Sequence, residues 1–310
     1  MDLALERVED AVLRKDMKLD DLIELYRRIH GFMASHVIEA IEVLKKVKSE
    51  CDVRVLSFTA NIVSTGLRGI LAQLIREGVF NVVITTCGTI DHDIARSFGA
   101  RYLKGRFDVD DAELYRKGMH RLGNIFIPLN DYGPLIEKVV YRVLDSIPAK
   151  EGRAWGVREL LHEIGKAISD DNSILKACAE KGVPIYVPGF VDGAFGTALF
   201  TYSKLRGLRI DALKDQEELA EIFFKAKKVG GLLIGGGISK HHALWWSQFA
   251  GGMEYAVYIT TAVEWDGSLS GARPREAITW GKVKEGARKV VVYADATLVL
   301  PIIAYGILYT

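Results

Sequence analysis

VRVLSFTANIVSTGLRGILAQLIREGVFNVVITT, residues 53–86, is the stretch that decides the fold class. Residues 53–59 and 80–86 are continuous runs rich in β-branched and apolar side chains, which is typical of strands buried on both faces of a sheet. Between them, residues 66–78 repeat leucine and isoleucine at helical spacing. A strand, a helix and a second strand in this order predict two parallel strands joined by a helical crossover.

The same alternation continues toward the C-terminus. Further strand candidates are NIFIPL (124–129), PIYVPG (184–189), GGLLIGGG (230–237), YAVYITTA (255–262) and KVVVYADA (289–296). Residues 1–50 instead show helical periodicity. The sequence therefore predicts an α/β protein: a doubly wound, Rossmann-like, mostly parallel sheet with an N-terminal helical extension. We expect a helical segment at 1–50 and a single α/β catalytic domain at 51–310.

Composition excludes several classes of function. The 41 basic and 40 acidic residues nearly cancel and form no long block, so nucleic-acid and membrane-surface roles have no support. The apolar run TLVLPIIAYGILY (297–309) is shorter than the roughly 20 residues that span a bilayer, and it predicts a buried core helix. Cys51, Cys87 and Cys178 are far apart, which indicates neither a disulfide framework nor a zinc site. We expect a cytoplasmic protein without a bound metal.

Small and polar residues follow six of the seven predicted strands. These segments are ANIVSTG (60–66), CGTIDHD (87–93), FVDGAFG (190–196), GGGISKHH (235–242), EWDGSLSGARPREAITWGK (264–282) and DATLVLP (295–301). Because the carboxyl ends of parallel strands meet at one edge of a sheet, the segments should converge on a ligand there. The GxGxxG fingerprint is missing after the first strand. The GGG at 235–237 suits either a phosphate at a helix N-terminus or a tight turn that binds nothing.

Lys282 and the histidine pair His241 and His242 are the residues with the clearest chemical potential. A lysine beside apolar or aromatic neighbours such as Trp280 can act as a nucleophile, because burial lowers its pKa. A surface lysine next to a tryptophan is equally consistent with this sequence. One histidine suits a general base, since it titrates near neutral pH. Adjacent histidines point in different directions, so both binding one metal is not expected.

Seven motifs in order resemble the deoxyhypusine synthase family, over roughly residues 20 to 310. They are NIVSTGLR (61–68), VITTCGTIDHD (83–93), GNIFIPLNDY (123–132), VPGFVDGAFG (187–196), GGGISKHH (235–242), DGSLSGARPREAITWGK (266–282) and VYADAT (292–297). The resemblance implies that Lys282 forms a covalent imine and that His241 assists proton transfer. It implies amine-binding roles for Asp91, Gly267, Ser268, Glu276 and Trp280. It implies NAD contacts for Asn61, Ser64, Thr86, Cys87, Gly88, Asp192, Gly236, Thr261, Ala262, Asp295 and Ala296.

The resemblance also implies a reaction and its partners. Spermidine loses a hydride to NAD, Lys282 takes the aminobutyl group as 1,3-diaminopropane leaves, and a lysine of the translation initiation factor 5A precursor receives the group. Reduction of the last imine by the retained NADH gives deoxyhypusine. Members of the family are homotetramers with active sites between paired subunits.

The chain departs from the family pattern where amines bind. Thr197 and Leu269 stand where aspartates are usual, and Asp91 and His92 replace paired glutamates. Each lost carboxylate weakens the expected recognition of a polyamine. Two alternatives therefore stay open: the same chemistry on another amine donor or acceptor, such as agmatine or putrescine, and a non-catalytic NAD-binding subunit.

Overall fold

The strand order is that of a doubly wound sheet. The computed structural model describes residues 7–147 and 153–310, so the first part of the expected helical segment, residues 1–6, lies outside the described residues. Within them, the main sheet has six parallel strands in the order β6-β2-β1-β7-β8-β9. Their bounds are β1 (Val53–Phe58), β2 (Val82–Ile84), β6 (Ile185–Tyr186), β7 (Val229–Ile234), β8 (Met253–Thr260) and β9 (Val283–Tyr293). The predicted fold class is confirmed.

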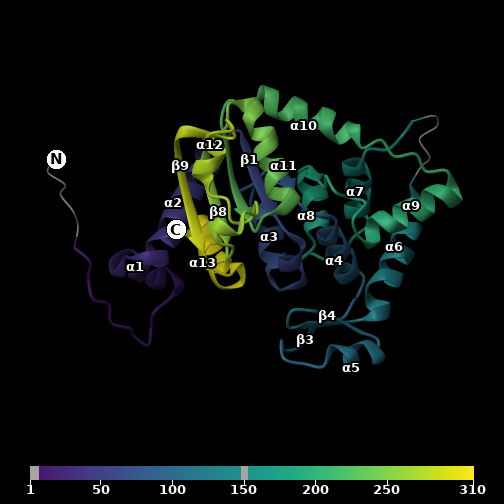
Figure 1. The fold of residues 1–310 in the computed structure, drawn as a ribbon, viewed down its shortest axis with the longest axis horizontal. Helices are drawn as coiled ribbons and strands as arrows, with labels where there is room; N and C mark the ends of the chain where they lie inside the picture. Colours follow the sequence, from purple (N-terminus) through teal and green to yellow (C-terminus); the bar gives the residue numbers. More distant parts are fainter. Residues whose placement is uncertain (1–6, 148–152) are drawn as a thin grey trace.

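Helices cover both faces of this sheet (Figure 1). They are α1 (Leu19–Ile29), α2 (Phe32–Glu50), α3 (Leu67–Arg76), α4 (Cys87–Ser97), α5 (Asp111–Arg116), α6 (Gly133–Ser146), α7 (Val157–Lys166), α8 (Ile174–Lys181), α9 (Ala194–Arg206), α10 (Leu213–Lys225), α11 (Gly237–Ser247), α12 (Pro274–Ile278) and α13 (Ala296–Tyr309), with the short 3-10 turn η1 (Ala60–Ser64). α10 and α11 pack on one face, and α2, α3, α4 and α13 belong to the larger core on the other. Residues of β1 alternate between the two cores, as a strand buried on both faces requires.

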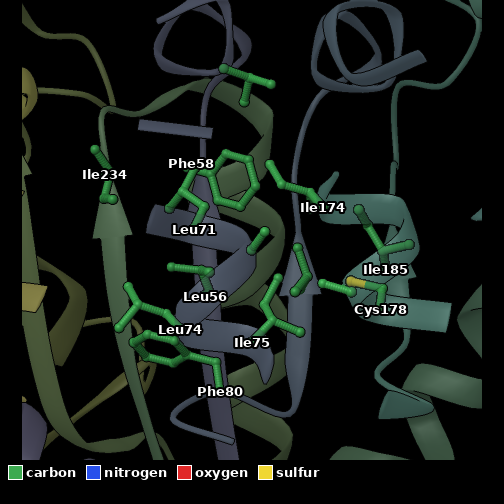
Figure 2. Close-up of a cluster of buried hydrophobic side chains, with 14 of the residues drawn as sticks. Leu56, Phe58, Leu71, Leu74, Ile75, Phe80, Ile174, Cys178, Ile185 and Ile234 are labelled. Carbon is green, nitrogen blue, oxygen red and sulfur yellow. The ribbon is translucent and has the colours of Figure 1, made fainter. Parts of the chain in front are cut away.

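The larger core is built from the strand-helix-strand stretch at residues 53–86. Leu56 and Phe58 of β1 pack against Leu71, Leu74 and Ile75 of α3, all fully buried (Figure 2). α2 belongs to the same core and packs on the sheet, and α1 packs on α2 and α13. The domain boundary at residue 51 stays a prediction.

α13 is packed as expected of a buried core helix. Leu300, Ile303 and Ile307 are buried, and a Cβ on Gly306 would lie 2.6 Å from Ile41 of α2. Glycine is therefore needed for the close approach of the two helices. No helix in the described part of the chain combines the length and the apolar character needed to cross a membrane.

One strand prediction placed its segment in the wrong sheet. Residues 124–129 contain β5 (Ile125–Pro128), but β5 lies between β3 (Leu103–Lys104) and β4 (Met119–Leu122) in a small antiparallel sheet. The cause is local. Leu122 pairs with Ile125, and the two residues between them make a tight hairpin in which Gly123 has a φ of 59°.

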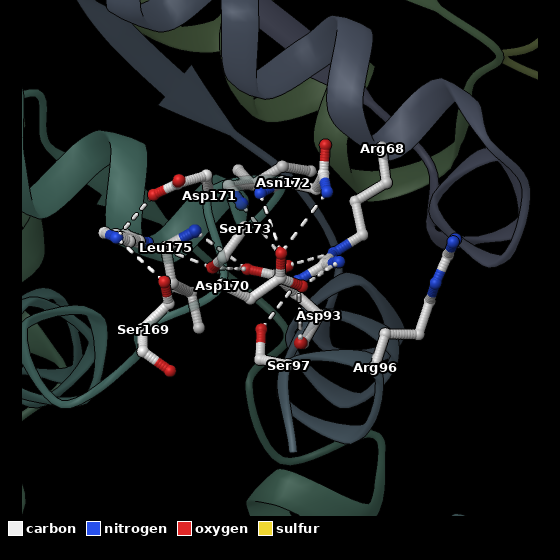
Figure 3. Close-up of polar contacts among 12 residues, drawn as sticks. Arg68, Asp93, Arg96, Ser97, Ser169, Asp170, Asp171, Asn172, Ser173 and Leu175 are labelled. Carbon is white, nitrogen blue, oxygen red and sulfur yellow. Dashed lines mark hydrogen bonds and ion pairs between the residues drawn. The ribbon is translucent and has the colours of Figure 1, made fainter. Parts of the chain in front are cut away.

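A buried ionic network connects α3, α4 and the start of α8 (Figure 3). Arg68 of α3 donates to Asp93 of α4, to Asp170 and to Ser97. Asp93, which is fully buried, also accepts from Ser173 Oγ at 2.8 Å and from the backbone of the first turn of α8. One carboxylate thus pairs a buried guanidinium and caps a helix.

Asp93→Asn is expected to destabilise the protein by about 3 kcal/mol, because the substitution leaves the Arg68 charge buried without its main partner. Urea unfolding followed by circular dichroism would measure the change. Asp171→Asn is the matched control: Asp171 pairs with Lys176 but its side chain is 87% exposed, so a change below about 0.5 kcal/mol is expected. Equal effects of the two substitutions would contradict the role given to Asp93.

Candidate active site

A first cavity, of about 440 Å³, lies at the carboxyl edge of β1, β7, β8 and β9. Its lining includes five of the residues that the motifs single out for a cofactor: Asn61, Ser64, Thr261, Asp295 and Ala296. β1 and β7 are neighbours in the sheet, and the chain leaves them toward opposite faces, through η1 and α3 on one side and α11 on the other. The cavity therefore lies at the topological switch point, where open α/β sheets bind ligands.

The small sheet contributes the outer wall of this cavity. Phe107 and the β4–β5 hairpin, residues 122–125, line it together with the ends of the main-sheet strands. The hairpin was missed as a wall because its strand was assigned to the main sheet. A signal was present in the sequence, since Gly-Asn between two short apolar runs favours a hairpin.

Helix N-termini point toward the same edge. α4 begins at Cys87 directly after β2, and α13 begins at Ala296 with Asp295 as its cap, which accepts from Thr297 N at 2.7 Å. The expected loop at residues 87–93 is thus the first two turns of a helix. Exposed N–H groups at helix starts bind anionic groups such as phosphates.

The remaining cofactor candidates are found around this edge but do not line the cavity. Thr86 occupies the N-cap position of α4 without a side-chain hydrogen bond to the helix, Gly88 packs against Ala60, and Asp192 lies exposed before α9. Cys87 is buried, its thiol donates to Phe190 O at 3.0 Å, and burial raises its thiol pKa to about 12. Ala262 N donates to Thr260 Oγ1 at 3.1 Å.

Gly236 shows why the GGG turn is needed. A Cβ there would lie 2.0 Å from Ser270 Oγ, so the turn packs directly against the loop at residues 264–273. Gly271 in that loop would place a Cβ 1.9 Å from Val263 O. Any larger residue would push the loop away from the sheet edge.

A second cavity, of about 290 Å³, contains Lys282. Its lining residues are Lys240, His241, Leu244, Trp245, Tyr258, Leu269, Ala272, Arg273, Glu276, Ala277, Trp280 and Lys282. Lys282 directly precedes β9, and its Nζ lies over two indole rings, 5.2 Å from the Trp280 centroid and 5.8 Å from the Trp245 centroid. The predicted nucleophile, histidine and aromatic wall are therefore in one cavity.

The two histidines have different environments. His241 is exposed in the first turns of α11, and its ring stacks on Trp245 at 6.0 Å. Partial burial and the nearby Lys282 ammonium lower the pKa of His241 below its usual 6.5. His242 faces the core instead and accepts from Trp246 Nε1 at 3.2 Å, and burial lowers its pKa to about 4.

Lys240 is a cavity residue to which the sequence assigned no role. It is 1% exposed, its Nζ donates to Leu269 O and Ala272 O at 2.8 Å each, and it lies 4.1 Å from the Tyr258 ring centroid. Burial lowers its pKa to about 8. Lys240 therefore attaches the loop at residues 264–273 to α11. A lysine one residue before a histidine in a helical pattern gives no sign of this contact.

The amine-binding candidates are only partly brought together. Glu276 and Trp280 line the Lys282 cavity, whereas Gly267 and Ser268 lie in the exposed loop beside it. Asp91 is 2% exposed and away from the cavity. Its oxygens accept from Ala194 N, Phe195 N and Tyr132 Oη, and so it caps α9.

The positions that depart from the family pattern are also separated. Leu269 lines the Lys282 cavity, Thr197 lies exposed on α9, and the His92 ring contacts Tyr102 Oη at 2.7 Å. Glu276 is the one carboxylate among the described residues that line the cavity. A cationic ligand would meet an apolar surface there rather than a row of acids.

The family model and the relatives that are similar in sequence agree on one family. The family model described as deoxyhypusine synthase matches residues 21–307. The chain is 55% identical over 309 residues to a probable deoxyhypusine synthase of Aeropyrum pernix, covering 98% of this chain and 99% of the relative. A probable deoxyhypusine synthase of Sulfolobus acidocaldarius is 55% identical over 307 residues, covering 99% of this chain and 98% of the relative. The crystal structure of a putative deoxyhypusine synthase from Entamoeba histolytica superposes with a TM-score of 0.63 at 21% identity, over 94% of this chain and 93% of that one, and supports the fold.

Proposed function

This chain belongs to the deoxyhypusine synthase family of transferases, and from that premise we propose how its residues act. We propose that it moves the aminobutyl group of spermidine to a lysine of the translation initiation factor 5A precursor, using NAD. The observation that carries the proposal is the Lys282 Nζ, which lies over the rings of both Trp245 and Trp280 in a cavity that also contains His241. A binding protein would have no use for a lysine amine in this position.

The cavity at the switch point fits a dinucleotide. Its volume is about 440 Å³, and helix N-termini and the Asp295 carboxylate offer partners for phosphate and ribose hydroxyl groups. Bound NAD would supply the acceptor, and later the donor, of a hydride. We propose that Asn61, Ser64, Thr261, Asp295 and Ala296 hold it in the cavity, with Thr86, Cys87, Gly88, Asp192, Gly236 and Ala262 shaping the surrounding edge.

The two cavities are close enough for one reaction. Tyr258 lines the lysine cavity and Thr260, two residues further along β8, lines the cofactor cavity. Two residues along a strand span about 7 Å, so the walls of the two cavities are about that far apart along β8. A donor amine beside Lys282 would thus lie next to a cofactor at the sheet edge.

His241 and Lys282 have different roles in the reaction of the donor amine: proton transfer and covalent bonding. Because its pKa lies below 6.5, His241 is mostly neutral at pH 7 and can accept a proton from the Lys282 ammonium or from the substrate. The neutral Lys282 amine then bonds to the oxidised carbon of the donor, and the carbon–nitrogen bond to 1,3-diaminopropane breaks. The resulting imine on Lys282 passes its aminobutyl group to the acceptor lysine, which restores the free amine.

A homotetramer in the cytoplasm is part of the proposal. His241, Glu276 and Trp280 are exposed in the single chain. A reaction that retains reduced NAD between steps needs an enclosed site, and a second copy over this face would enclose it. The protein substrate is a translation factor, which is found in the cytoplasm.

A different amine donor is the second candidate, and Leu269 favours it. A leucine in the cavity wall cannot compensate the charge of a polyamine nitrogen, so a less charged donor such as putrescine would lose less on binding. The chemistry at Lys282 would be unchanged.

Transfer of label tests the proposed function. Purified protein is incubated with NAD, spermidine labelled in its aminobutyl part and the factor precursor, and the factor is analysed by mass spectrometry. We expect label on one lysine, dependent on NAD, and none on a precursor with arginine at that lysine. Label from putrescine or agmatine but not from spermidine would favour the second candidate, and no label from any amine would contradict both.

A further inference from the structure

The Lys282 cavity has little negative charge with which to bind an amine. Lys240, Arg273 and Lys282 are cationic, whereas Glu276 is the one acid among the described residues of its lining. Lys240 is already hydrogen-bonded to two carbonyls, and Arg273 forms an ion pair with Glu264 at 2.9 Å. An ammonium group that loses its water in this cavity needs another favourable partner.

The rings of Trp245 and Trp280 provide such a partner. A cation over an indole face is attracted by the ring's quadrupole, by about 0.5–1 kcal/mol at exposed sites and about 2 kcal/mol when desolvated. The Lys282 ammonium lies 5.2 Å and 5.8 Å from the two ring centroids, which marks a position where a cation contacts both rings. When Lys282 is neutral and acts as a nucleophile, a substrate ammonium beside it can contact the same two rings.

Trp245 is held in place for this contact rather than for core packing. It is 43% exposed, whereas the next residue, Trp246, is 8% exposed and packs in the core. Its ring stacks on His241 at 6.0 Å and meets the edge of Phe249 at 6.1 Å. Phe249 in turn packs on Phe224 at 5.4 Å. The ring is thus supported from two sides while it lines the cavity.

We infer that Trp245 is a specificity-determining residue, which with Trp280 binds the cationic end of the donor amine through the ring faces. The inference rests on the proposed function and adds to it the means of amine recognition. Binding by the two rings would also allow the site to recognise an amine without a carboxylate at position 269, where the chain has a leucine. The ligand class is an alkylammonium with an apolar carbon chain, which fits an apolar cavity with aromatic walls.

Calorimetric titration of the full-length protein with spermidine, in the presence of NAD, tests the inference. Trp245→Leu keeps an apolar side chain but removes the ring, and it is expected to weaken the Kd about tenfold. Trp245→Phe keeps a weaker ring and should weaken the Kd by about threefold. Tyr115→Leu is the control: it removes an exposed ring from α5, outside the lining of both cavities, and no change in Kd is expected.

Several results would overturn the inference. The first is a Trp245→Leu variant that binds spermidine as tightly as the wild type, and the second is equal weakening by phenylalanine and leucine at this position. The others are equal weakening by Tyr115→Leu and a wild type that binds no spermidine. Thermal melting checks folding, and Trp245→Phe decides the matter if the leucine variant does not fold. The transfer assay is separate: a protein that binds amine in the expected order but transfers no label contradicts the proposed function and leaves the aromatic pair standing.

Discussion

Replacing Lys282 with alanine is expected to abolish transfer of the aminobutyl group while leaving NAD binding nearly unchanged. The amine of Lys282 makes the covalent bond in the proposed reaction, and removing such a nucleophile lowers the rate by roughly 10⁴-fold or more. Lys282 lines the smaller cavity and is absent from the lining of the larger one proposed for NAD. Label transfer measures the first effect, and calorimetric titration with NAD measures the second.

Lys284→Ala is the matched control for this variant. Lys284 lies two residues further along the same segment, its Nζ pairs with Glu254 at 2.6 Å, and it does not line either cavity. Transfer should stay within about twofold of the wild type, since this half-buried ion pair lies outside both cavities and single ion pairs near the surface contribute little to stability. Normal turnover by Lys282→Ala, or loss of turnover by both variants, would contradict the assignment of Lys282.

His241→Ala is expected to lower the rate of transfer by about 10²–10⁴-fold with the fold intact. The exposed ring lies beside Lys282 and Trp245, and its pKa lies below 6.5, so the wild-type rate should fall as the pH drops through that pKa and His241 becomes protonated. The alanine variant should lack this part of the pH profile. Rates measured from pH 5 to 8 check both expectations.

His242→Ala separates a catalytic effect from a structural one. His242 accepts from Trp246 Nε1 and is neutral, because burial lowers its pKa to about 4. Its loss leaves a buried indole N–H without its partner and should cost about 1–3 kcal/mol of stability with a small kinetic effect. Equal kinetic defects in the two histidine variants would leave the role of His241 unsupported.

The strand and helix pattern was predictable wherever it repeated. The stretch at residues 53–86 encodes a complete strand-helix-strand unit, and the other strands of the main sheet have the same apolar runs. The segment at 124–129 has this composition too, yet it pairs with β4 through a two-residue hairpin. The composition of a segment indicates whether it is buried, whereas its partner strand depends on the turn that precedes it. The two-residue turn before β5 is too short for the crossover that joins parallel strands.

The candidate site was predictable where chemistry marked a residue, and less so where packing did. Lys282, His241 and Trp280 come together as the motifs imply. The sequence did not predict Trp245 as a cavity residue, because a tryptophan in an apolar helix usually packs in the core, as Trp246 does. Asp91 has the charge of an amine ligand, but its burial and the amides that it caps belong to the fold and are not encoded in its neighbours.

Trapping of the covalent intermediate tests directly whether Lys282 carries the substrate fragment. The protein is incubated with NAD and spermidine, reduced with borohydride, digested and mapped by mass spectrometry. The account predicts one adduct, an added aminobutyl group on Lys282, that depends on NAD. Lys240 is the internal comparison, because it lines the same cavity and burial lowers its pKa to about 8, which favours a reactive amine. An adduct on Lys240 or on any other lysine in place of Lys282 would contradict the claim that Lys282 carries the substrate fragment.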